Sequence, residues 1–143
     1  MPIALFALAI AAFGIGTTEF VMMGVLPQAA ATFGVSIPSA GYLITAYALG
    51  VVVGAPLLTA SAVRLPRKTL LMALMGLFTT GNVLFALSPN LEFGIAFRFI
   101  AGLPHGAFFG AGAVVALSLV EKGNRAKAVG AARIAQDLFR HSF

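Results

Sequence analysis

The sequence predicts an all-α membrane protein with four transmembrane helices. Apolar residues make up 60% of the 143 residues and charged residues only 9%, against roughly 25% charged residues in an ordinary soluble protein. The mean hydropathy is +1.02, and four apolar stretches reach about the 20 residues that a helix needs to cross a bilayer. A chain this apolar is neither a soluble domain nor intrinsically disordered.

The four predicted spans cover residues 3–26, 41–63, 69–87 and 93–120. Pro27 ends the first span, and the fourth is long enough to cross the bilayer with a tilt. We expect each span to be a helix, because a helix satisfies its backbone hydrogen bonds within itself in lipid. A β-barrel is not expected, since barrel strands alternate apolar and polar residues and these stretches do not.

The basic residues predict how the spans are oriented. Arg64, Arg67 and Lys68 lie between the second and third spans, whereas the first and third connections carry no basic residue. Five more follow the fourth span: Lys122, Arg125, Lys127, Arg133 and Arg140. Because Lys-rich and Arg-rich loops stay in the cytoplasm, we expect both termini to be cytoplasmic. The net charge of +5 then reflects topology, and we expect the lipid bilayer as a partner and no nucleic acid.

Residues 131–143 are predicted to form a cytoplasmic tail. Arg133, Gln136, Asp137 and Arg140 interrupt its apolar positions, and a charge at the bilayer centre costs about 2.5–3.5 kcal/mol. We therefore expect a short cytoplasmic or interfacial helix in this part of the chain, and not a fifth span.

The composition excludes several kinds of site. The chain has no cysteine, which excludes disulfides, Cys-ligated zinc and a thiol nucleophile. His105 and His141 lie in unrelated segments and do not form a metal site. No nucleophile–base pair and no phosphate-binding loop is recognisable, so we expect neither an enzyme nor a bound cofactor.

Two charged residues remain inside the predicted spans, Glu19 and Arg98. Counted from the outer ends of their spans, Glu19 lies about 10 Å deep and Arg98 about 8 Å deep, so we expect them to pair. Pairing reduces the cost of burying each charge, and a carboxyl group that alternates between paired and protonated states is what a proton-coupled transporter requires. The alternative is that Arg98 extends to the outer interface and Glu19 lies near the headgroups.

The fourth span carries a further candidate and a packing pattern. His105 shares a helix face with Arg98 and Phe109, and imidazole is suited to proton transfer near neutral pH. The alternative for His105 is a hydrogen bond to a neighbouring helix and no further role. Small residues also recur every four positions, which lets helices approach closely. The glycines of these stripes are Gly50, Gly54, Gly102, Gly106 and Gly110.

Four segments carry a resemblance to a known family: residues 13–30, 40–60, 64–71 and 98–110. They are similar to the first four helices of major facilitator superfamily transporters, above all to bacterial drug:proton antiporters of the arabinose-efflux-permease-like and chloramphenicol-efflux-like groups. The resemblance covers about residues 3–130. It implies four helices of the N-terminal six-helix bundle of that fold, a location in the bacterial inner membrane, and a divergent tail over residues 131–143.

The resemblance also implies roles for single residues. Arg98, Gly102 and Gly106 match the helix-four motif that is associated with proton coupling, and Glu19 matches an acidic residue that follows a Thr-Thr pair. The loop between the second and third spans resembles a conformational latch, which here consists of Arg64, Pro66, Arg67 and Lys68. Val63 stands at the acidic position of that motif, so the latch lacks its carboxylate partner.

By this resemblance, the chain takes part in proton-coupled efflux of a small molecule, a sugar or a drug, with the proton gradient as its energy source. Superfamily members have twelve spans in two halves, so we expect a truncated or fragmentary transporter that is completed by a C-terminal portion or by self-association. Two alternatives stay open. One is a four-span dimer of the small multidrug-resistance type, which fits the span count and Glu19. The other is a non-transporting membrane subunit or a degenerate gene product.

Overall fold

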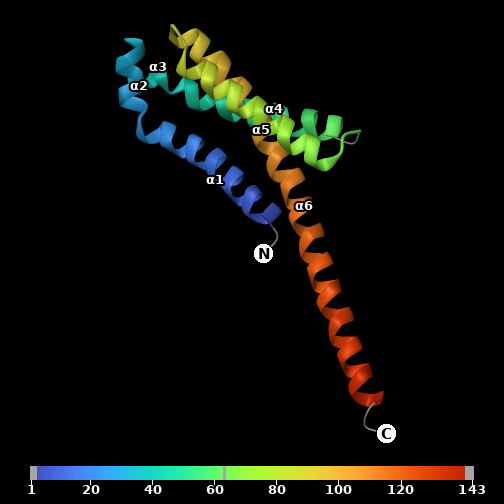
Figure 1. Ribbon diagram of the computed structural model, residues 1–143. Helices are drawn as coiled ribbons and strands as arrows, with labels where there is room; N and C mark the ends of the chain where they lie inside the picture. The colour runs from blue at the N-terminus through green and yellow to red at the C-terminus, as the bar shows by residue number, and fades with distance from the viewer. Residues whose placement is uncertain (1–2, 63, 141–143) are drawn as a thin grey trace.

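The computed structural model describes the backbone of residues 3–62 and 64–140 and the side chains of residues 3–60 and 64–119. Every element in the described residues is a helix (Figure 1): α1 (Ile3–Gly24), α2 (Leu26–Phe33), α3 (Ile37–Ala40), α4 (Tyr42–Ala62), α5 (Arg67–Ala86) and α6 (Leu91–Arg140). Four stretches of the described chain are long and apolar enough to cross a membrane: Ile3–Gly24, Ile37–Ala60, Arg67–Ala86 and Leu91–Leu119. The predicted all-α architecture with four spans is confirmed.

Two short helices, α2 and α3, occupy the first connection. Pro27 lies in the first turn of α2, where its missing N–H leaves no helical hydrogen bond unmade. Gly34 ends α2 in the left-handed conformation with φ 64°, which glycine adopts without a steric penalty. The hydroxyl of Ser36 caps α3 by accepting the N–H of Ser39 at 3.3 Å. The chain therefore leaves α1 through a folded segment before it enters α4.

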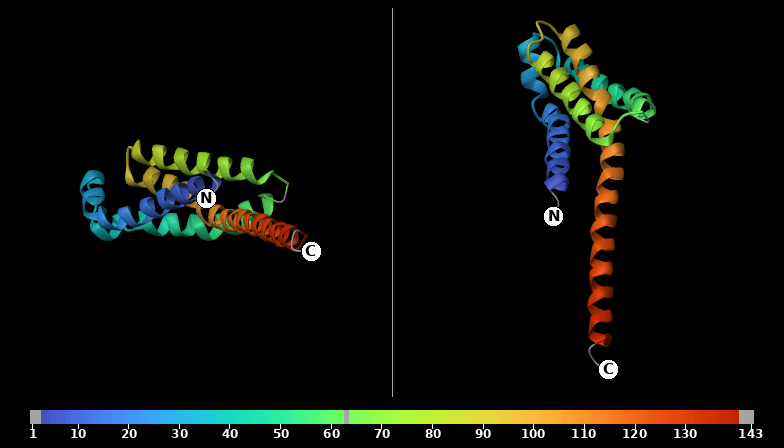
Figure 2. Two further views of the ribbon diagram at one scale, coloured as in Figure 1. Left: turned by 60° about the horizontal axis from the view of Figure 1, so that its bottom comes forward. Right: turned by 45° about the vertical axis from the view of Figure 1, so that its right-hand side comes forward.

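Helix α6 is a single element of 50 residues, which is about 75 Å long at 1.5 Å per residue. The hydrocarbon core of a bilayer is about 30 Å thick, so α6 extends well beyond it, and Figure 2 shows the helix projecting away from the others. The tail is helical over residues 131–140, as predicted, but it is not a short helix, because its backbone continues α6. This stretch contains no proline and is rich in good helix formers such as Ala and Arg. Residues 141–143 lie outside the described residues.

Helix α6 is also the central packing element of the bundle. It packs along α4 and α5, whereas α1 touches it at few points (Figure 1). The buried core draws side chains from all four long helices: Ile15, Tyr47, Leu70, Leu74, Phe78, Ala101, Ala107 and Phe108. Many large apolar side chains face outward, as expected where lipid surrounds the bundle.

Glycines allow the backbones of α4 and α6 to come into direct contact. A Cβ atom added at Gly50 would collide with the carbonyl of Phe99, and one added at Gly54 would collide with the backbone of Leu103. At these two positions any larger residue of α4 would push the helices apart. This is the geometry that stripes of small residues allow in membrane helices.

The glycine stripe of α6 contributes to this contact over only part of its length. An added Cβ at Gly102 would collide with the carbonyl of Tyr47, and one at Gly106 would lie 2.6 Å from the Cβ of Ala55. Nothing lies within 4 Å of an added Cβ at Gly110, one turn further on. The inclusion of Gly110 in the packing stripe is therefore corrected, because the close contact of α6 with α4 does not extend to this residue.

This contact predicts that Gly54→Ala destabilises the protein whereas Gly110→Ala does not. The methyl group at residue 54 has no room, and overpacking of this kind costs about 1–3 kcal/mol. The methyl group at residue 110 meets open space, so its effect stays within about 0.5 kcal/mol. Unfolding of both variants in mixed micelles, followed by circular dichroism over an SDS titration, measures the difference. Equal stability of the two variants would contradict the close α4–α6 contact.

Candidate functional site

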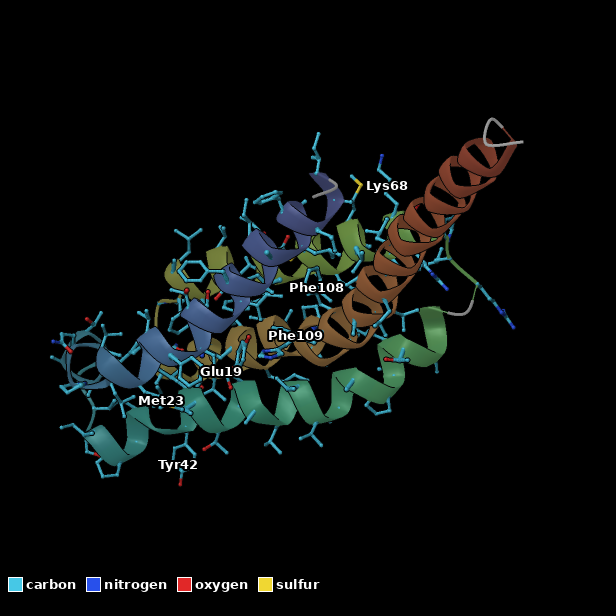
Figure 3. All side chains as sticks on the ribbon, turned by 90° about the horizontal axis from the view of Figure 1, so that it is seen from below. Glu19, Met23, Tyr42, Lys68, Phe108 and Phe109 are labelled. Atoms are coloured by element: carbon cyan, nitrogen blue, oxygen red, sulfur yellow. The ribbon has the colours of Figure 1, made fainter. Side chains whose placement is uncertain are left out.

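Four polar side chains meet inside the otherwise apolar bundle. Glu19 comes from α1, Tyr47 from α4, and Arg98 and His105 from α6. Figure 3 shows Glu19 on the side of α1 that faces α4 and α6. Ionisable residues within transmembrane segments are costly and usually functional. We therefore take these four residues, called the polar cluster below, as the candidate site.

His105 is the centre of the polar cluster. Its Nδ1 atom forms a hydrogen bond of 3.0 Å with the hydroxyl group of Tyr47, and the same atom lies 4.0 Å from Oε2 of Glu19. The ring of Phe109 covers the imidazole, with ring centroids 5.0 Å apart. The Glu19 side chain is 36% exposed and that of His105 is 16% exposed, so the carboxylate forms the open edge of the cluster.

Arg98 is the most deeply buried charge of the described residues, with 2% of its surface exposed. Its guanidinium carbon lies 4.3 Å above the ring of Tyr47 and 5.6 Å from the ring of Phe85. Cation–π contacts of this kind stabilise a desolvated cation. Its Nε atom has no hydrogen-bond partner. The free N–H of a buried guanidinium can still donate a hydrogen bond to a further acidic or polar partner.

The structure corrects the predicted pairing of Glu19 with Arg98. Among the described side chains the basic group within 4.0 Å of the Glu19 carboxylate is the imidazole of His105, which lies two turns beyond Arg98 on α6. The difference in depth comes from helix α2. The ring of Phe33, the last residue of α2, lies beside the ring of Phe85 near the end of α5, with the centroids 6.4 Å apart. Phe33, and not the last residue of α1, therefore lies at the level of the end of α5. Glu19 therefore lies deeper in the bundle than the count along the first span predicts.

Tyr47 is a site residue that the sequence analysis did not single out. It is 2% exposed, and it contacts Arg98 through its ring and His105 through its hydroxyl group. The signal in the sequence is a tyrosine one turn before Gly50 in a glycine stripe. A phenol within an apolar span needs a hydrogen-bond partner, and the glycine stripe indicates that this partner lies on the helix packed against the stripe.

The latch-like loop residues lie apart from the polar cluster, where α4 ends and α5 begins. Arg64 and Pro66 belong to the connection, and Arg67 and Lys68 are the first residues of α5. Val63 lies outside the described residues. None of the three basic groups is within 4.0 Å of a carboxylate among the described side chains. Within that same part of the chain no group of three His, Asp or Glu residues could hold a metal ion.

The geometry is compatible with two positions of the proton in the hydrogen bond between Nδ1 of His105 and the hydroxyl group of Tyr47. A neutral imidazole carries a proton on one nitrogen and a lone pair on the other. With the proton on Nδ1, His105 donates to the hydroxyl oxygen of Tyr47, while the carboxylate of Glu19 lies beyond hydrogen-bond distance at 4.0 Å. With a lone pair on Nδ1, the Tyr47 hydroxyl group donates instead.

Comparison with known proteins identifies the family. The sequence profile of the Major Facilitator Superfamily matches residues 8–138. The chain belongs to this superfamily. The resemblance carried by its sequence motifs is thus confirmed, and this family is a family of transporters. This membership also argues against the small multidrug-resistance alternative.

Several proteins are similar to this chain over most of its length. The inner membrane transport protein YdhP of Escherichia coli is 54% identical over 125 residues, which are 87% of this chain and 32% of YdhP. The chloramphenicol resistance protein of Streptomyces lividans is 35% identical over 90% of this chain and 33% of its own length. A probable sugar efflux transporter of Helicobacter pylori is 32% identical over 87% and 32%. The chain thus spans about a third of the length of these relatives. No solved structure matches it significantly.

The hydrogen bond between Tyr47 and His105 predicts a difference between the two tyrosines of this superfamily member. Tyr47→Phe removes the hydroxyl group and should cost about 0.5–1.5 kcal/mol of stability, whereas Tyr42→Phe, at an exposed position of the same helix, should cost less. Nitrogen-15 NMR of labelled histidine should show altered His105 ring resonances only in Tyr47→Phe. If neither variant alters the ring resonances, the hydrogen bond is absent.

Proposed function

We propose that the chain forms the proton-coupling part of a small-molecule efflux transporter in a bacterial inner membrane, with both termini cytoplasmic. The observation that carries this function is the contact of Glu19 with His105 inside the bundle, with Tyr47 on the same imidazole nitrogen. A carboxyl group, an imidazole and a phenol in contact within apolar spans form a proton relay and have little structural purpose in lipid.

The proton enters through Glu19, because this is the most exposed member of the polar cluster. Protonation of Glu19 removes the charge that attracts His105, and the Tyr47 hydroxyl group then holds the imidazole in place. Loss of the proton restores the attraction between α1 and α6. The two protonation states therefore favour different contacts between these helices, which is the requirement for coupling a proton to movement of a transporter.

Arg98 supports this cycle through its fixed positive charge. The guanidinium lies against the ring of Tyr47 and forms no ion pair with the carboxylate of Glu19 among the described side chains. Its rigid position between the rings of Tyr47 and Phe85 keeps the charge buried in both states of the carboxyl group. We propose that the fixed charge of Arg98 keeps the electrostatic potential at the polar cluster constant while Glu19 gains and loses its proton.

An apolar groove beside the polar cluster favours a drug over a sugar as the substrate. The groove has a volume of about 310 Å³ and lies between α1 and α6, with Phe109 next to His105 and Leu5, Ala12, Gly112 and Ala116 further along. Among the described residues, no polar side chain lines it. A sugar needs several hydrogen-bonding partners in its site, whereas a mostly apolar drug needs few.

The rest of the transporter must supply the opposite wall of this groove. The chain spans about a third of the length of its relatives, and the groove between α1 and α6 is open. We propose that a C-terminal portion or a second copy of the chain covers it. The proton gradient drives the cycle, and no other cofactor is required.

This function predicts that Glu19→Gln abolishes proton-driven transport whereas Glu92→Gln does not. Both substitutions replace a carboxyl group by an amide, but Glu92 lies at the exposed start of α6, outside the polar cluster. Inverted membrane vesicles from cells that make the chain should accumulate radiolabelled chloramphenicol more than radiolabelled arabinose. Accumulation should fall to the level of vesicles without the chain only in Glu19→Gln.

A second measurement tests the proton site without requiring transport. The infrared band of a protonated carboxyl group in the membrane should change with pH in the wild type and in Glu92→Gln, and it should be lost in Glu19→Gln. Transport with unchanged pH dependence in Glu19→Gln would refute the assignment of Glu19. Absence of both transport and a pH-dependent carboxyl band would instead favour the non-transporting subunit.

A further inference from the structure

A small apolar cluster lies next to Arg98, at the end of the bundle where α5 ends and α6 begins. Three side chains from different helices meet there over Gly94 of α6: Phe33 of α2, Leu43 of α4 and Phe85 of α5. A Cβ atom added at Gly94 would lie 3.3 Å from Cζ of Phe33 and 3.5 Å from Cε2 of Phe85. Figure 1 shows α2 at this end of the bundle. The absence of a side chain at Gly94 therefore leaves the space that the two rings occupy.

The ring of Phe85 joins this apolar cluster to the polar cluster. Its centroid lies 6.4 Å from that of Phe33, with the ring planes at 47°, and 5.6 Å from the guanidinium carbon of Arg98. Arg98 follows Gly94 by four residues, which is about 6 Å along the same face of α6. Phe33 of the first connection and Arg98 within the span thus contact the same aromatic ring.

The guanidinium of Arg98 is held to a large extent by ring faces. Tyr47 and Phe85 both lie within cation–π distance of it, and its Nε atom has no hydrogen-bond partner among the described residues. The face of an aromatic ring carries negative charge and its edge positive charge, so the attraction depends on the orientation of the ring. A rotation of the Phe85 ring would therefore weaken its hold on the cation.

We propose that Phe85 is a positioning residue for Arg98, and that Phe33 keeps the Phe85 ring in the orientation that this requires. The inference rests on the proposed function, in which the fixed charge of Arg98 supports proton coupling. It adds a residue of α5 and a residue of the first connection to the groups that set the polar cluster. Helix α2 thereby contributes to the site without contacting Glu19 or His105 through Phe33.

The contact can be tested by fluorination of a single ring. Phenylalanine analogues with one, two or three ring fluorines are incorporated at residue 85. Fluorine withdraws electron density from the ring face and changes the shape of the ring little, so it weakens a cation–π contact selectively. The matched control is the same series at Phe97, a half-buried ring that stacks on Phe93 with centroids 6.0 Å apart. No cation lies over Phe97 among the described residues.

Fluorination at residue 85 should act on Arg98 in steps. The nitrogen-15 side-chain resonance of Arg98, assigned with Arg98→Lys, should move further with each fluorine at residue 85 and stay constant in the Phe97 series. The unfolding equilibrium constant in an SDS titration should rise about fivefold over the whole series, as expected for a cation–π contact of moderate strength. In inverted vesicles, kcat for proton-driven chloramphenicol accumulation should fall in the same steps with an unchanged KM.

The role of Phe33 is tested by a double-mutant cycle with Phe85. Phe33→Leu should move the Arg98 resonance in the same direction as fluorination at residue 85. In a chain that carries Phe85→Leu, adding Phe33→Leu should move it no further, because Phe33 acts through the ring that is missing. Phe13→Leu is the control, since this ring of α1 is 76% exposed, and it should leave the Arg98 resonance unchanged.

Three results would overturn the inference. A constant Arg98 resonance in the Phe85 series, or an equal change in the Phe97 series, would show that the ring face does not hold the guanidinium. A full effect of Phe33→Leu in the Phe85→Leu chain would show that Phe33 does not act through Phe85. Wild-type transport throughout the Phe85 series would show that the contact has no role in coupling. Stepwise changes in resonance and stability without transport by the wild type would instead support the contact and refute the proposed function.

Discussion

The direct contact between the backbones of α4 and α6 is the constraint on which the candidate site depends. Gly102 has no Cβ, so the carbonyl of Tyr47 can lie against it, and Gly50 allows the same approach one turn later. Only at this separation does the Tyr47 ring lie beneath Arg98 and its hydroxyl group reach His105. The glycines that pack the helices therefore also assemble the polar cluster.

Burial of Arg98 follows from the same contact. An isolated cation in hydrocarbon is costly, but here two aromatic rings supply electron density where no carboxylate is in contact. This arrangement leaves the carboxylate of Glu19 free to interact with His105. If Glu19 and Arg98 formed a tight ion pair, the carboxyl group would resist protonation, and a proton-coupled cycle would lose its switch.

The sequence predicted the spans well because hydropathy and helix length act locally along the chain. The glycine contacts at residues 50, 54, 102 and 106 could also be predicted, since a four-residue spacing defines a helix face.

Tyr47 and Gly81, which packs against Ala101, were missed because a single residue carries no periodic signal. The depth of Glu19 was misjudged because it depends on how α2 folds, and no property of α1 encodes that. The continuity of α6 was missed because charges argue against membrane insertion but do not end a helix.

Helix α1 links the polar cluster with the apolar groove beside it, and it is the least tightly held of the long helices. It carries Glu19 near one end, and its first turns form one wall of that groove with Leu5, Leu8 and Ala12. The other three long helices are fixed by extensive packing around α6. A change in the charge of Glu19 acts on the one long helix that has few other contacts to break. The element that binds the proton is thus also the element that can move at the lowest cost.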